Sequence, residues 1–397
     1  MEDKSDILYL AKKYGTPIFL IDLNKIIENL QRFRNAFKKE QNIIIGYSVK
    51  TNYYSEILKK LFEQKVYPEV ICDIDYEFSK RSGGDLSKVI FNGPAKTEEE
   101  LEKAIKNNAF LIIVDSETEL DKIEKIALKL DKKVDIGIRI NPKIDFKSPF
   151  IGNTKLGIKK KYAKKLIENL RNYKHINLKA LHVNIGTQII DIKAHAQALQ
   201  YLLNFSRELK NDLNINIKYI DLGGGYASET TLNENGLSIT DFANEIHKIM
   251  KQNNSNQTLI FEPGRYIVED ACYVISKVIS IKEQNDKWVL LDISANYLVP
   301  LNTAKYKVEP VDKSVKTEVY NFGGRISYSA DIIQKRVKFP KLKEGDIVLV
   351  RNTGAYTWSW SANYGDLLPP IIIKENNNYR LSKKRQTLKQ VYRSKCV

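Results

Sequence analysis

The sequence has few of the residues that would support a disulfide framework or a membrane span. It contains only three cysteines in 397 residues, and they are scattered without metal-type spacing. Their odd number excludes a complete disulfide framework and indicates a reducing compartment. No apolar run approaches the about 20 residues needed to cross a bilayer. The first 13 residues carry three acidic side chains instead of the basic and apolar regions of a secretory signal. We therefore expect a cytoplasmic protein with no membrane segment and no metal site.

The net charge of +16 raises the question of an anionic partner. Lysines alternate with Asp and Glu along amphipathic patterns such as Leu120–Lys133, and no segment combines Lys or Arg with interleaved aromatic residues. This pattern is typical of an ordinary solvated surface. The alternative is a positive field that attracts an anionic substrate; nucleic acid is not the expected partner.

Strand-like apolar runs alternate with helical patterns through the first two thirds of the chain. The expected strands are Ile43–Tyr47, Glu69–Ile71, Val89–Phe91, Phe110–Val114, Val134–Ile140, Leu178–Val183, Ile217–Leu222 and Thr258–Glu262. The expected helices include Tyr54–Gln64, Thr97–Asn107, Glu117–Leu130, Lys161–Asn172, Lys193–Leu209 and Ile239–Gln252. Eight strands with intervening helices predict a (β/α)8 barrel of the α/β class, with a doubly wound open sheet as the competing architecture.

Beyond Arg265 the pattern changes to short runs of β-branched and aromatic residues without helical periodicity. These runs are Tyr273–Lys282, Trp288–Asp292, Val315–Phe322, Asp346–Arg351 and Ile371–Ile373. They predict an all-β C-terminal domain over residues 269–397, after a barrel over residues 1–268 whose first 25 residues join the β domain. Trp358 and Trp360 would share one face of a strand and pack in its core; the alternative is an aromatic pocket for a bulky substrate.

Three segments that end predicted strands carry residues suited to binding a phosphorylated cofactor. Lys50 follows an apolar strand, which suits a Schiff-base lysine, although it could also be an ordinary solvated lysine. The triplet 223–225 is all glycine and can turn backbone N–H groups toward an anion, or form a tight turn or bulge. Glu262 and Arg265 could contact a pyridine nitrogen and a phosphate, or form a structural salt bridge.

Taken together and in this order, these segments resemble the pyridoxal 5'-phosphate (PLP)-dependent decarboxylases of the alanine-racemase-like barrel type. That family includes diaminopimelate, ornithine and carboxynorspermidine decarboxylases. The resemblance covers nearly the whole chain, including residues 14–17, 91–97, 139–142, 155–158 and 354–356. It implies that Lys50 is the Schiff-base lysine and Glu262 the partner of the pyridine nitrogen. It also implies phosphate contacts from Gly223, Gly224, Gly225, Gly264, Arg265 and Tyr356, and a homodimer with shared active sites.

Three departures from the family pattern lie at the substrate end of the site. Asn184 replaces the histidine that stacks on the PLP ring, while His182 would lie deeper in the barrel. Ser327 and Tyr328 replace the Cys that protonates the substrate and the Glu that binds a distal amine. A serine hydroxyl is a far weaker acid than a thiol with its pKa of about 8.5, so Tyr328, Lys50 or water is an alternative donor. Pro300 replaces the Arg that grips the distal carboxylate of diaminopimelate.

The resemblance and these departures predict a decarboxylase of an α-amino carboxylate in specialised metabolism. Candidate settings are peptide-antibiotic tailoring of the microcin C type, siderophore assembly and polyamine synthesis, with a substrate that is a small molecule or a modified peptide or nucleotide. An amino-acid racemase or epimerase is an alternative, although Glu262 favours decarboxylation. A PLP-binding pseudoenzyme or regulator is the other alternative, because the family Cys is lost.

Overall fold

The computed structural model describes residues 3–40, 42–283, 285–299, 304–311 and 316–396. Internal contacts divide the chain into two compact units, one made of residues 1–28 with 267–397 and the other of residues 29–266. The expected domain limits stay a prediction, because a compact set of contacts does not test independent folding. The two units are described separately.

The unit of residues 29–266 is built on eight parallel strands that close into a barrel, so the predicted (β/α)8 architecture is confirmed. Its strands are β2 (Ile43–Ser48), β3 (Tyr67–Val70), β4 (Ile90–Phe91), β5 (Leu111–Val114), β6 (Val134–Asn141), β8 (Ile176–His182), β9 (Tyr219–Asp221) and β10 (Thr258–Phe261). Each strand pairs in parallel with the next, and the pairings of β5 with β6 and of β10 with β2 close the ring. A two-residue strand, β7 (Ile158–Lys159), adds to β6.

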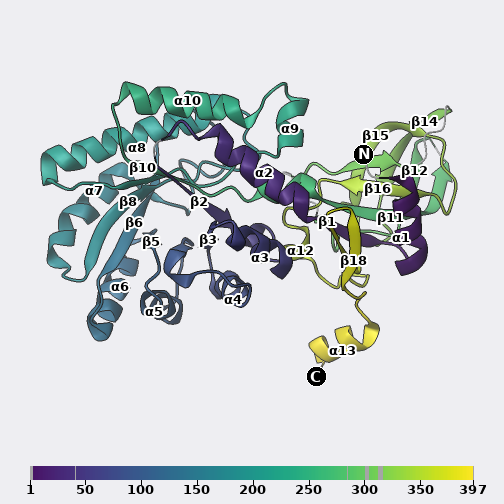
Figure 1. The fold of residues 1–397 in the computed structure, drawn as a ribbon, viewed down its shortest axis with the longest axis horizontal. Helices are drawn as coiled ribbons and strands as arrows, with labels where there is room; N and C mark the ends of the chain where they lie inside the picture. The colour runs from purple at the N-terminus through teal and green to yellow at the C-terminus, as the bar shows by residue number, and fades with distance from the viewer. Residues whose placement is uncertain (1–2, 41, 284, 300–303, 312–315, 397) are drawn as a thin grey trace. The chain divides into compact units, whose positions relative to one another are not determined.

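Helices follow the barrel strands and lie around the outside of the ring (Figure 1). They are α3 (Ser55–Glu63), α4 (Asp73–Arg81), α5 (Glu98–Lys106), α6 (Glu117–Leu130), α7 (Lys160–Asn169), α8 (Ile192–Leu213), α9 (Glu229–Glu234) and α10 (Ile239–Gln252). Local chemistry sets some of their limits: Thr97 and Glu100 form a capping box that begins α5. Inside the ring, apolar side chains from five strands form a packed core that includes Ile113, Ala180 and Ile260, as expected of a barrel of this size.

The other unit contains a curled, mostly antiparallel sheet. Its strands are β1 (Ile18–Asp22), β11 (Cys272–Glu283), β12 (Lys287–Leu291), β13 (Lys307–Pro310), β14 (Thr317–Gly323), β15 (Ile332–Pro340), β16 (Ile347–Arg351), β17 (Ile371–Glu375) and β18 (Asn378–Lys383). The pairings of β1 with β17 and of β12 with β14 are parallel, and the others are antiparallel. The predicted β domain is confirmed, with β1 from the start of the chain pairing between β11 and β17.

Helices in this part of the chain depart from the expected pattern. Near the start of the chain lies α1 (Lys4–Tyr14). From Arg265 onward, where no helix was expected, the chain contains α11 (Arg265–Val268), α12 (Thr357–Trp360) and α13 (Leu388–Cys396). The expectation that Trp358 and Trp360 share a strand face is therefore wrong, because both lie on the single turn of α12. Trp360 is 56% exposed and does not lie in a core. The Lys383 ammonium group lies over the Trp358 ring, 4.3 Å from the ring centre.

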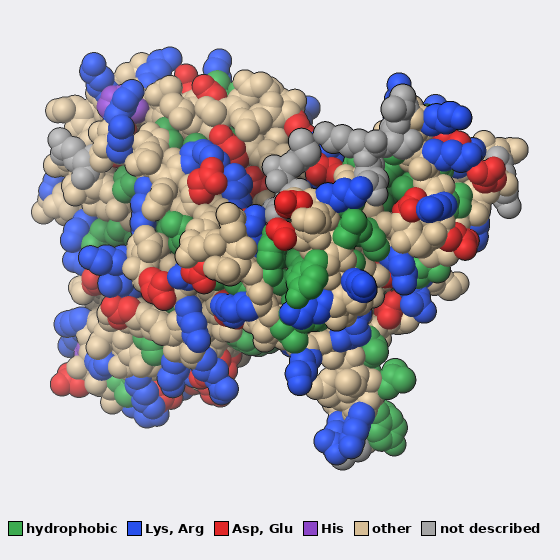
Figure 2. Space-filling model, turned by 45° about the vertical axis from the view of Figure 1, so that its right-hand side comes forward, with side chains coloured by type: hydrophobic (Ala, Val, Ile, Leu, Met, Phe, Trp, Pro, Cys, Tyr) green, Lys and Arg blue, Asp and Glu red, His purple; other side chains and the backbone are tan. Residues whose placement is uncertain are grey.

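Charged side chains of both signs are interspersed on the face shown in Figure 2. This distribution resembles the mixed charge pattern along the sequence. Within the described residues, no helix is long and apolar enough to cross a membrane.

Candidate active site

Lys50 lies at the carboxyl end of β2, in a short 3-10 turn formed by Val49–Thr51. Its Nζ is 2.8 Å from Oε2 of Glu69, whose side chain is buried in β3. The two residues meet because β2 and β3 are parallel and pair Ser48 with Glu69. The Lys50 side chain is 31% exposed, so its amine lies at the rim of the barrel and not in its core.

A hydrogen-bonded chain links Lys50 to Glu262 across the carboxyl ends of four strands. The side-chain amide of Asn92, just after β4, donates to Glu69 Oε1 at 2.9 Å and to Glu262 Oε1 at 2.7 Å. Sequence reasoning missed the roles of Glu69 and Asn92. Their place at strand ends was the available signal, but no local pattern shows that one amide bridges two carboxylates from separate strands.

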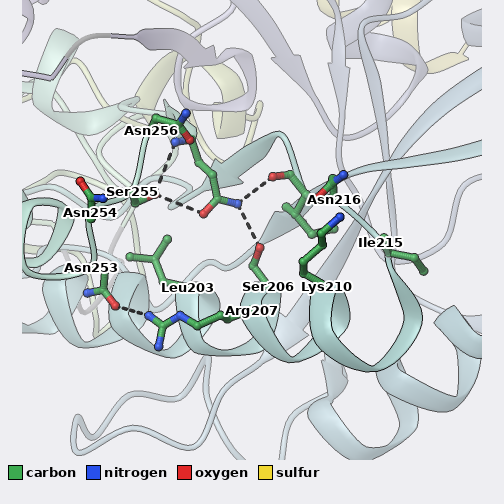
Figure 3. A pocket seen from close by; sticks show the side chains of 12 residues that line it. Leu203, Ser206, Arg207, Lys210, Ile215, Asn216, Asn253, Asn254, Ser255 and Asn256 are labelled. Atoms are coloured by element: carbon green, nitrogen blue, oxygen red, sulfur yellow. Dashed lines mark hydrogen bonds between the residues drawn. The ribbon is translucent and has the colours of Figure 1, made fainter.

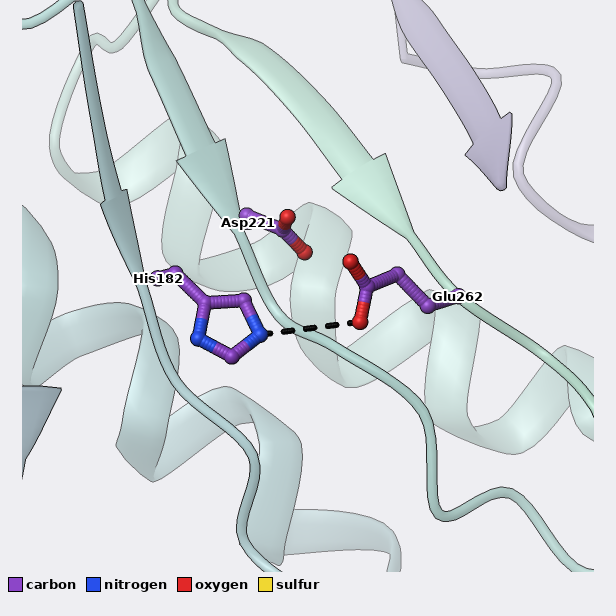
Figure 4. A group of neighbouring side chains, drawn as sticks. All are labelled: His182, Asp221 and Glu262. Carbon is purple, nitrogen blue, oxygen red and sulfur yellow. Dashed lines mark ion pairs between the residues drawn. The ribbon is translucent and has the colours of Figure 1, made fainter. Parts of the chain in front are cut away.

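His182, Asp221 and Glu262 form a buried group at the ends of β8, β9 and β10 (Figure 4). His182 Nε2 is 3.5 Å from Glu262 Oε2, which is longer than a good hydrogen bond. Burial favours a neutral Glu262, but His182, the Lys50 charge and the Asn92 amide outweigh it and lower the pKa of Glu262 below its ordinary value. Burial and then the Glu262 charge raise the pKa of Asp221 well above its ordinary value.

The pKa values of the two carboxyl groups are thus shifted in opposite directions, which favours the ionised form of Glu262 and the protonated form of Asp221. One ligand atom from each of the three residues lies within 4.8 Å of the others, a geometry that could also hold a metal ion. However, Asn92 donates to Glu262, and the Gly223 N–H donates to Asp221 Oδ1 at 2.9 Å. Each of these bonds uses one oxygen of a carboxyl group.

The glycine triplet forms a turn directly after β9 with its backbone packed against neighbouring strand ends. A Cβ on Gly223 would lie 2.5 Å from the Val183 carbonyl oxygen, and one on Gly224 would lie 2.7 Å from that of Glu262. The Gly223 carbonyl accepts from the Glu262 N–H at 2.8 Å, and the Gly225 carbonyl from the Ile189 N–H at 3.0 Å. Among the described residues, the N–H groups of Gly224 and Gly225 have no hydrogen-bond acceptor. The turn thus offers two donors to an anion.

Gly264 and Arg265 lie beside this turn because the backbone N–H of Glu262 is hydrogen-bonded to the Gly223 carbonyl. A Cβ on Gly264 would overlap the Thr51 hydroxyl, so only glycine lets the two strand ends approach this closely. Arg265 is 5% exposed and begins α11.

Asn184 borders the same turn, since a Cβ on Gly223 would lie 3.3 Å from Asn184 Cα. Its Oδ1 accepts from the Gly186 N–H at 3.2 Å. Within the unit of residues 29–266, the structure thus places six expected site residues at the carboxyl end of the barrel, with Gly264 and Arg265 next to them. The six are Lys50, Asn184, Gly223, Gly224, Gly225 and Glu262.

The remaining expected residues belong to the unit that contains the β domain. Ser327 and Tyr328 lie in an exposed loop between β14 and β15, and Tyr356 precedes α12. Asp331 holds this loop, because its Oδ1 accepts from the Ala295 N–H at 2.7 Å and its Oδ2 from the Ile326 N–H at 3.3 Å. Pro300 lies outside the described residues.

A hollow at the other end of the barrel is a poor candidate for the active site. It is lined by α8 and by residues 215–217 and 253–257, which precede β9 and β10 (Figure 3). Catalytic groups of such barrels lie at the carboxyl ends of the strands, and the amino ends serve stability. In the hollow, Gln257 Nε2 donates to Ser206 Oγ and to the Ile217 carbonyl, which is a structural arrangement.

Comparison with known proteins decides the family. Residues 23–269, more than half of the chain, match the family model described as "Pyridoxal-dependent decarboxylase, pyridoxal binding domain". This chain belongs to that family. It is a PLP-dependent decarboxylase with the alanine-racemase-like barrel, as its resemblance to the family predicted.

Several proteins similar to this chain over nearly its full length are named diaminopimelate decarboxylase. The chain is 28% identical to the diaminopimelate decarboxylase of Aquifex aeolicus over 95% of this chain and 91% of that protein. It is 29% identical to the enzyme of the same name from Campylobacter jejuni, over 90% of each. Crystal structures of diaminopimelate decarboxylase from M. jannaschii and from Helicobacter pylori, the latter complexed with L-lysine, match with TM-scores of 0.92 and 0.90 at 27% and 28% identity. They cover 98% of this chain, and 94% and 98% of their own.

The residues of the barrel fit the cofactor of this family. Two backbone N–H groups of the glycine turn can donate hydrogen bonds to a phosphate, an ionised carboxylate at Glu262 can hold a proton on a pyridine nitrogen, and the Lys50 amine lies at the rim. The close approaches of Gly223, Gly224 and Gly264 leave no room for side chains at those positions.

Proposed function

We propose that this decarboxylase acts on an α-amino carboxylate other than diaminopimelate, in specialised metabolism. The observation that carries the proposal is the pair Ser327 and Tyr328, where the family pattern has Cys and Glu. The surrounding loop is held by close contacts: Asp331 accepts from two backbone N–H groups, and a Cβ on Gly324 would lie 2.6 Å from Ser294 Cα. The backbone of the loop is therefore held in place, whereas the side chains at positions 327 and 328 differ from the family pattern.

In this proposal the barrel residues hold the cofactor. Lys50 would provide the amine that bonds it, Glu262 would keep its ring nitrogen protonated, and Asn184 would contact its ring. The phosphate contacts come from Gly223, Gly224, Gly225, Gly264 and Arg265, with Tyr356 adding its hydroxyl. When bound, PLP accepts the electron pair left behind when CO2 leaves.

Two groups of the chain set the charge around that reaction. Glu262 is buried and anionic, which suits it to stabilise a cationic ring nitrogen. Glu69 holds the Lys50 ammonium group by an ion pair at 2.8 Å, and Lys50 must release a proton before its amine can act as a nucleophile.

The substrate end supports a substrate without the distal groups of diaminopimelate. Tyr328 cannot form the ion pair with a distal ammonium group that a Glu would form, and Pro300 cannot bind a distal carboxylate as an Arg would. Ser327 takes the place of the family's thiol donor but is a poor acid at neutral pH, so we propose that Tyr328, Lys50 or water delivers the proton to Cα. Tyr328 is 46% exposed, with its ring centre 6.4 Å from that of Tyr364, which gives this loop an aromatic side for a bulky substrate.

A modified peptide, nucleotide, siderophore or polyamine precursor fits this description, and peptide-antibiotic tailoring of the microcin C type is one such setting. The +16 charge would favour an anionic version of the substrate. We also propose a cytoplasmic homodimer with shared active sites; the three free cysteines agree with a reducing compartment.

Diaminopimelate is the competing substrate, because two relatives that match over 90% or more of this chain bear its name. The test is a mass-spectrometric screen for loss of CO2 from diaminopimelate, lysine, ornithine and amino-modified peptides and nucleotides. We expect turnover of a compound from the last two groups and none of diaminopimelate; turnover of diaminopimelate would overturn the argument from Tyr328 and Pro300. Exchange of the Cα proton with deuterium without loss of CO2 would indicate a racemase instead.

Lys50→Ala is the control that ties turnover to the proposed site. The variant should lose activity by at least about 10³-fold, because the covalent step has no substitute amine. Retained activity in Lys50→Ala would show that another lysine bonds the cofactor.

A further inference from the structure

His195 is a fully buried histidine of α8 whose side chain contacts the backbone of the glycine turn. Its Nε2 lies 3.0 Å from the carbonyl oxygen of Gly224. A carbonyl oxygen can only accept a hydrogen bond, so Nε2 must carry the hydrogen. Burial lowers the pKa of His195 to about 4, which leaves the ring neutral at pH 7 with Nε2 as its N–H.

Aromatic neighbours hold the plane of this imidazole. Tyr226, which follows the turn, stacks on it with ring centres 4.0 Å apart and an angle of 10°. Phe242 of α10 meets the same imidazole edge-on, with ring centres 5.9 Å apart. Both His195 and Tyr226 are buried, so the direction of the Nε2–H bond is fixed by packing.

The hydrogen bond from His195 determines where a neighbouring N–H points. In a planar trans peptide unit, the carbonyl of one residue and the N–H of the next point in opposite directions. Holding the Gly224 carbonyl toward α8 therefore turns the Gly225 N–H the other way. The carbonyls of Gly223 and Gly225 are held by backbone N–H groups of Glu262 and Ile189, whereas that of Gly224 is held by a side chain.

We propose that His195 is a positioning residue, which aims the Gly225 N–H at the phosphate of the cofactor without touching it. Glycine residues have little conformational preference of their own, so a turn of three needs such an anchor. The inference rests on PLP as the cofactor, and it adds a residue that the glycine motif itself does not reveal.

The test compares His195→Phe and His195→Gln with the wild-type protein, using PLP and pyridoxal, which lacks the phosphate. Phe keeps the ring stack but removes the donor, while Gln keeps an N–H donor on a side chain of similar reach. Equilibrium dialysis measures each dissociation constant, and thermal unfolding shows whether each variant is folded.

We expect His195→Phe to weaken PLP binding about tenfold, the effect of losing one hydrogen bond, and to leave pyridoxal binding within about twofold. His195→Gln should restore most of the affinity for PLP. Unchanged PLP binding in His195→Phe, or an equal loss for PLP and pyridoxal, would overturn the proposal. Should His195→Phe not fold, His195→Gln decides: a PLP affinity within about threefold of wild type supports the donor role, and a larger loss refutes it. Absence of PLP binding by the wild-type protein would refute the cofactor assignment instead.

Discussion

At the scale of residues, the candidate site separates two carboxyl groups of the same kind by their surroundings. Glu262 accepts a hydrogen bond from Asn92 and lies near His182 and Lys50, which lower its pKa. The pKa of Asp221 is raised, first by burial and then by the Glu262 charge beside it. Opposite shifts in adjacent groups are typical of a site that must hold a proton in one place.

The raised pKa of Asp221 predicts a particular dependence of stability on pH. A carboxyl group whose pKa is higher in the native state binds its proton more tightly there. Its contribution to stability is therefore full below the unfolded pKa and is lost as the pH rises through the native one. In Asp221→Asn the amide oxygen can still accept from the Gly223 N–H, and no proton has to be retained.

We expect the free energy of unfolding of Asp221→Asn, relative to wild type, to increase steadily from pH 4 to pH 7. Urea unfolding at a series of pH values measures this difference. Asp145→Asn is the matched control, because Asp145 is exposed and its replacement should leave the wild-type pH profile in place. A flat difference for Asp221→Asn would mean that Asp221 is ionised in the native protein.

At the scale of elements, the glycine turn after β9 joins backbone geometry to cofactor binding. Gly225 has a φ of +93°, and a Cβ there would lie 2.6 Å from the Gly186 carbonyl oxygen. Gly236, after α9, also has a positive φ of +69°, but nothing lies within 4 Å of its Cβ position. A side chain at Gly236 would therefore meet backbone strain alone, whereas one at Gly225 would meet both backbone strain and steric overlap.

Gly236→Ala should cost about 1–2 kcal/mol of stability, the cost of a left-handed residue with a side chain. Gly225→Ala should cost more than this, because the turn must also move away from Gly186, and it should weaken PLP binding as the Gly225 N–H shifts. Urea unfolding and equilibrium dialysis with PLP measure the two effects. Equal losses of stability in both variants, with normal PLP binding, would show that the turn adapts without harm.

The elements also show how far periodic patterns predict structure. Glu117–Leu130 and Ile239–Gln252 are helices with the limits that their amphipathic patterns predicted. The pattern missed α4, whose buried face includes Asp75 and Ser79, because polar residues conceal its periodicity. It missed α13 because that helix buries no residue in the chain, so it has no apolar stripe facing a core.

At the scale of the whole molecule, the two sets of expected site residues belong to different compact units. Lys50 and Glu262 belong to residues 29–266, whereas Ser327, Tyr328 and Tyr356 belong to the unit of residues 1–28 and 267–397. The proposed homodimer would complete each site with residues from a second copy.

That proposal predicts an enzyme whose activity depends on its concentration. Light scattering after gel filtration should give twice the mass of the chain, and activity per chain should fall by about half when the protein is diluted to its dimer dissociation constant. The cause is loss of the partner's contribution to the site, so PLP saturation of the barrel should fall less than turnover. A fully active monomer at all concentrations would exclude shared sites.

The sequence by itself determined the alternation of strands and helices, and with it the barrel, the β domain and the place of Lys50, the glycine triplet and Glu262 at strand ends. These features depend on periodicity and order along the chain, which are local. Only the tertiary structure decided which polar groups meet: Asn92 bonds Glu262 across 170 positions, Asp221 has a raised pKa, and His195 holds Gly224. Burial and distances between remote residues set these properties, and no segment of the sequence contains them.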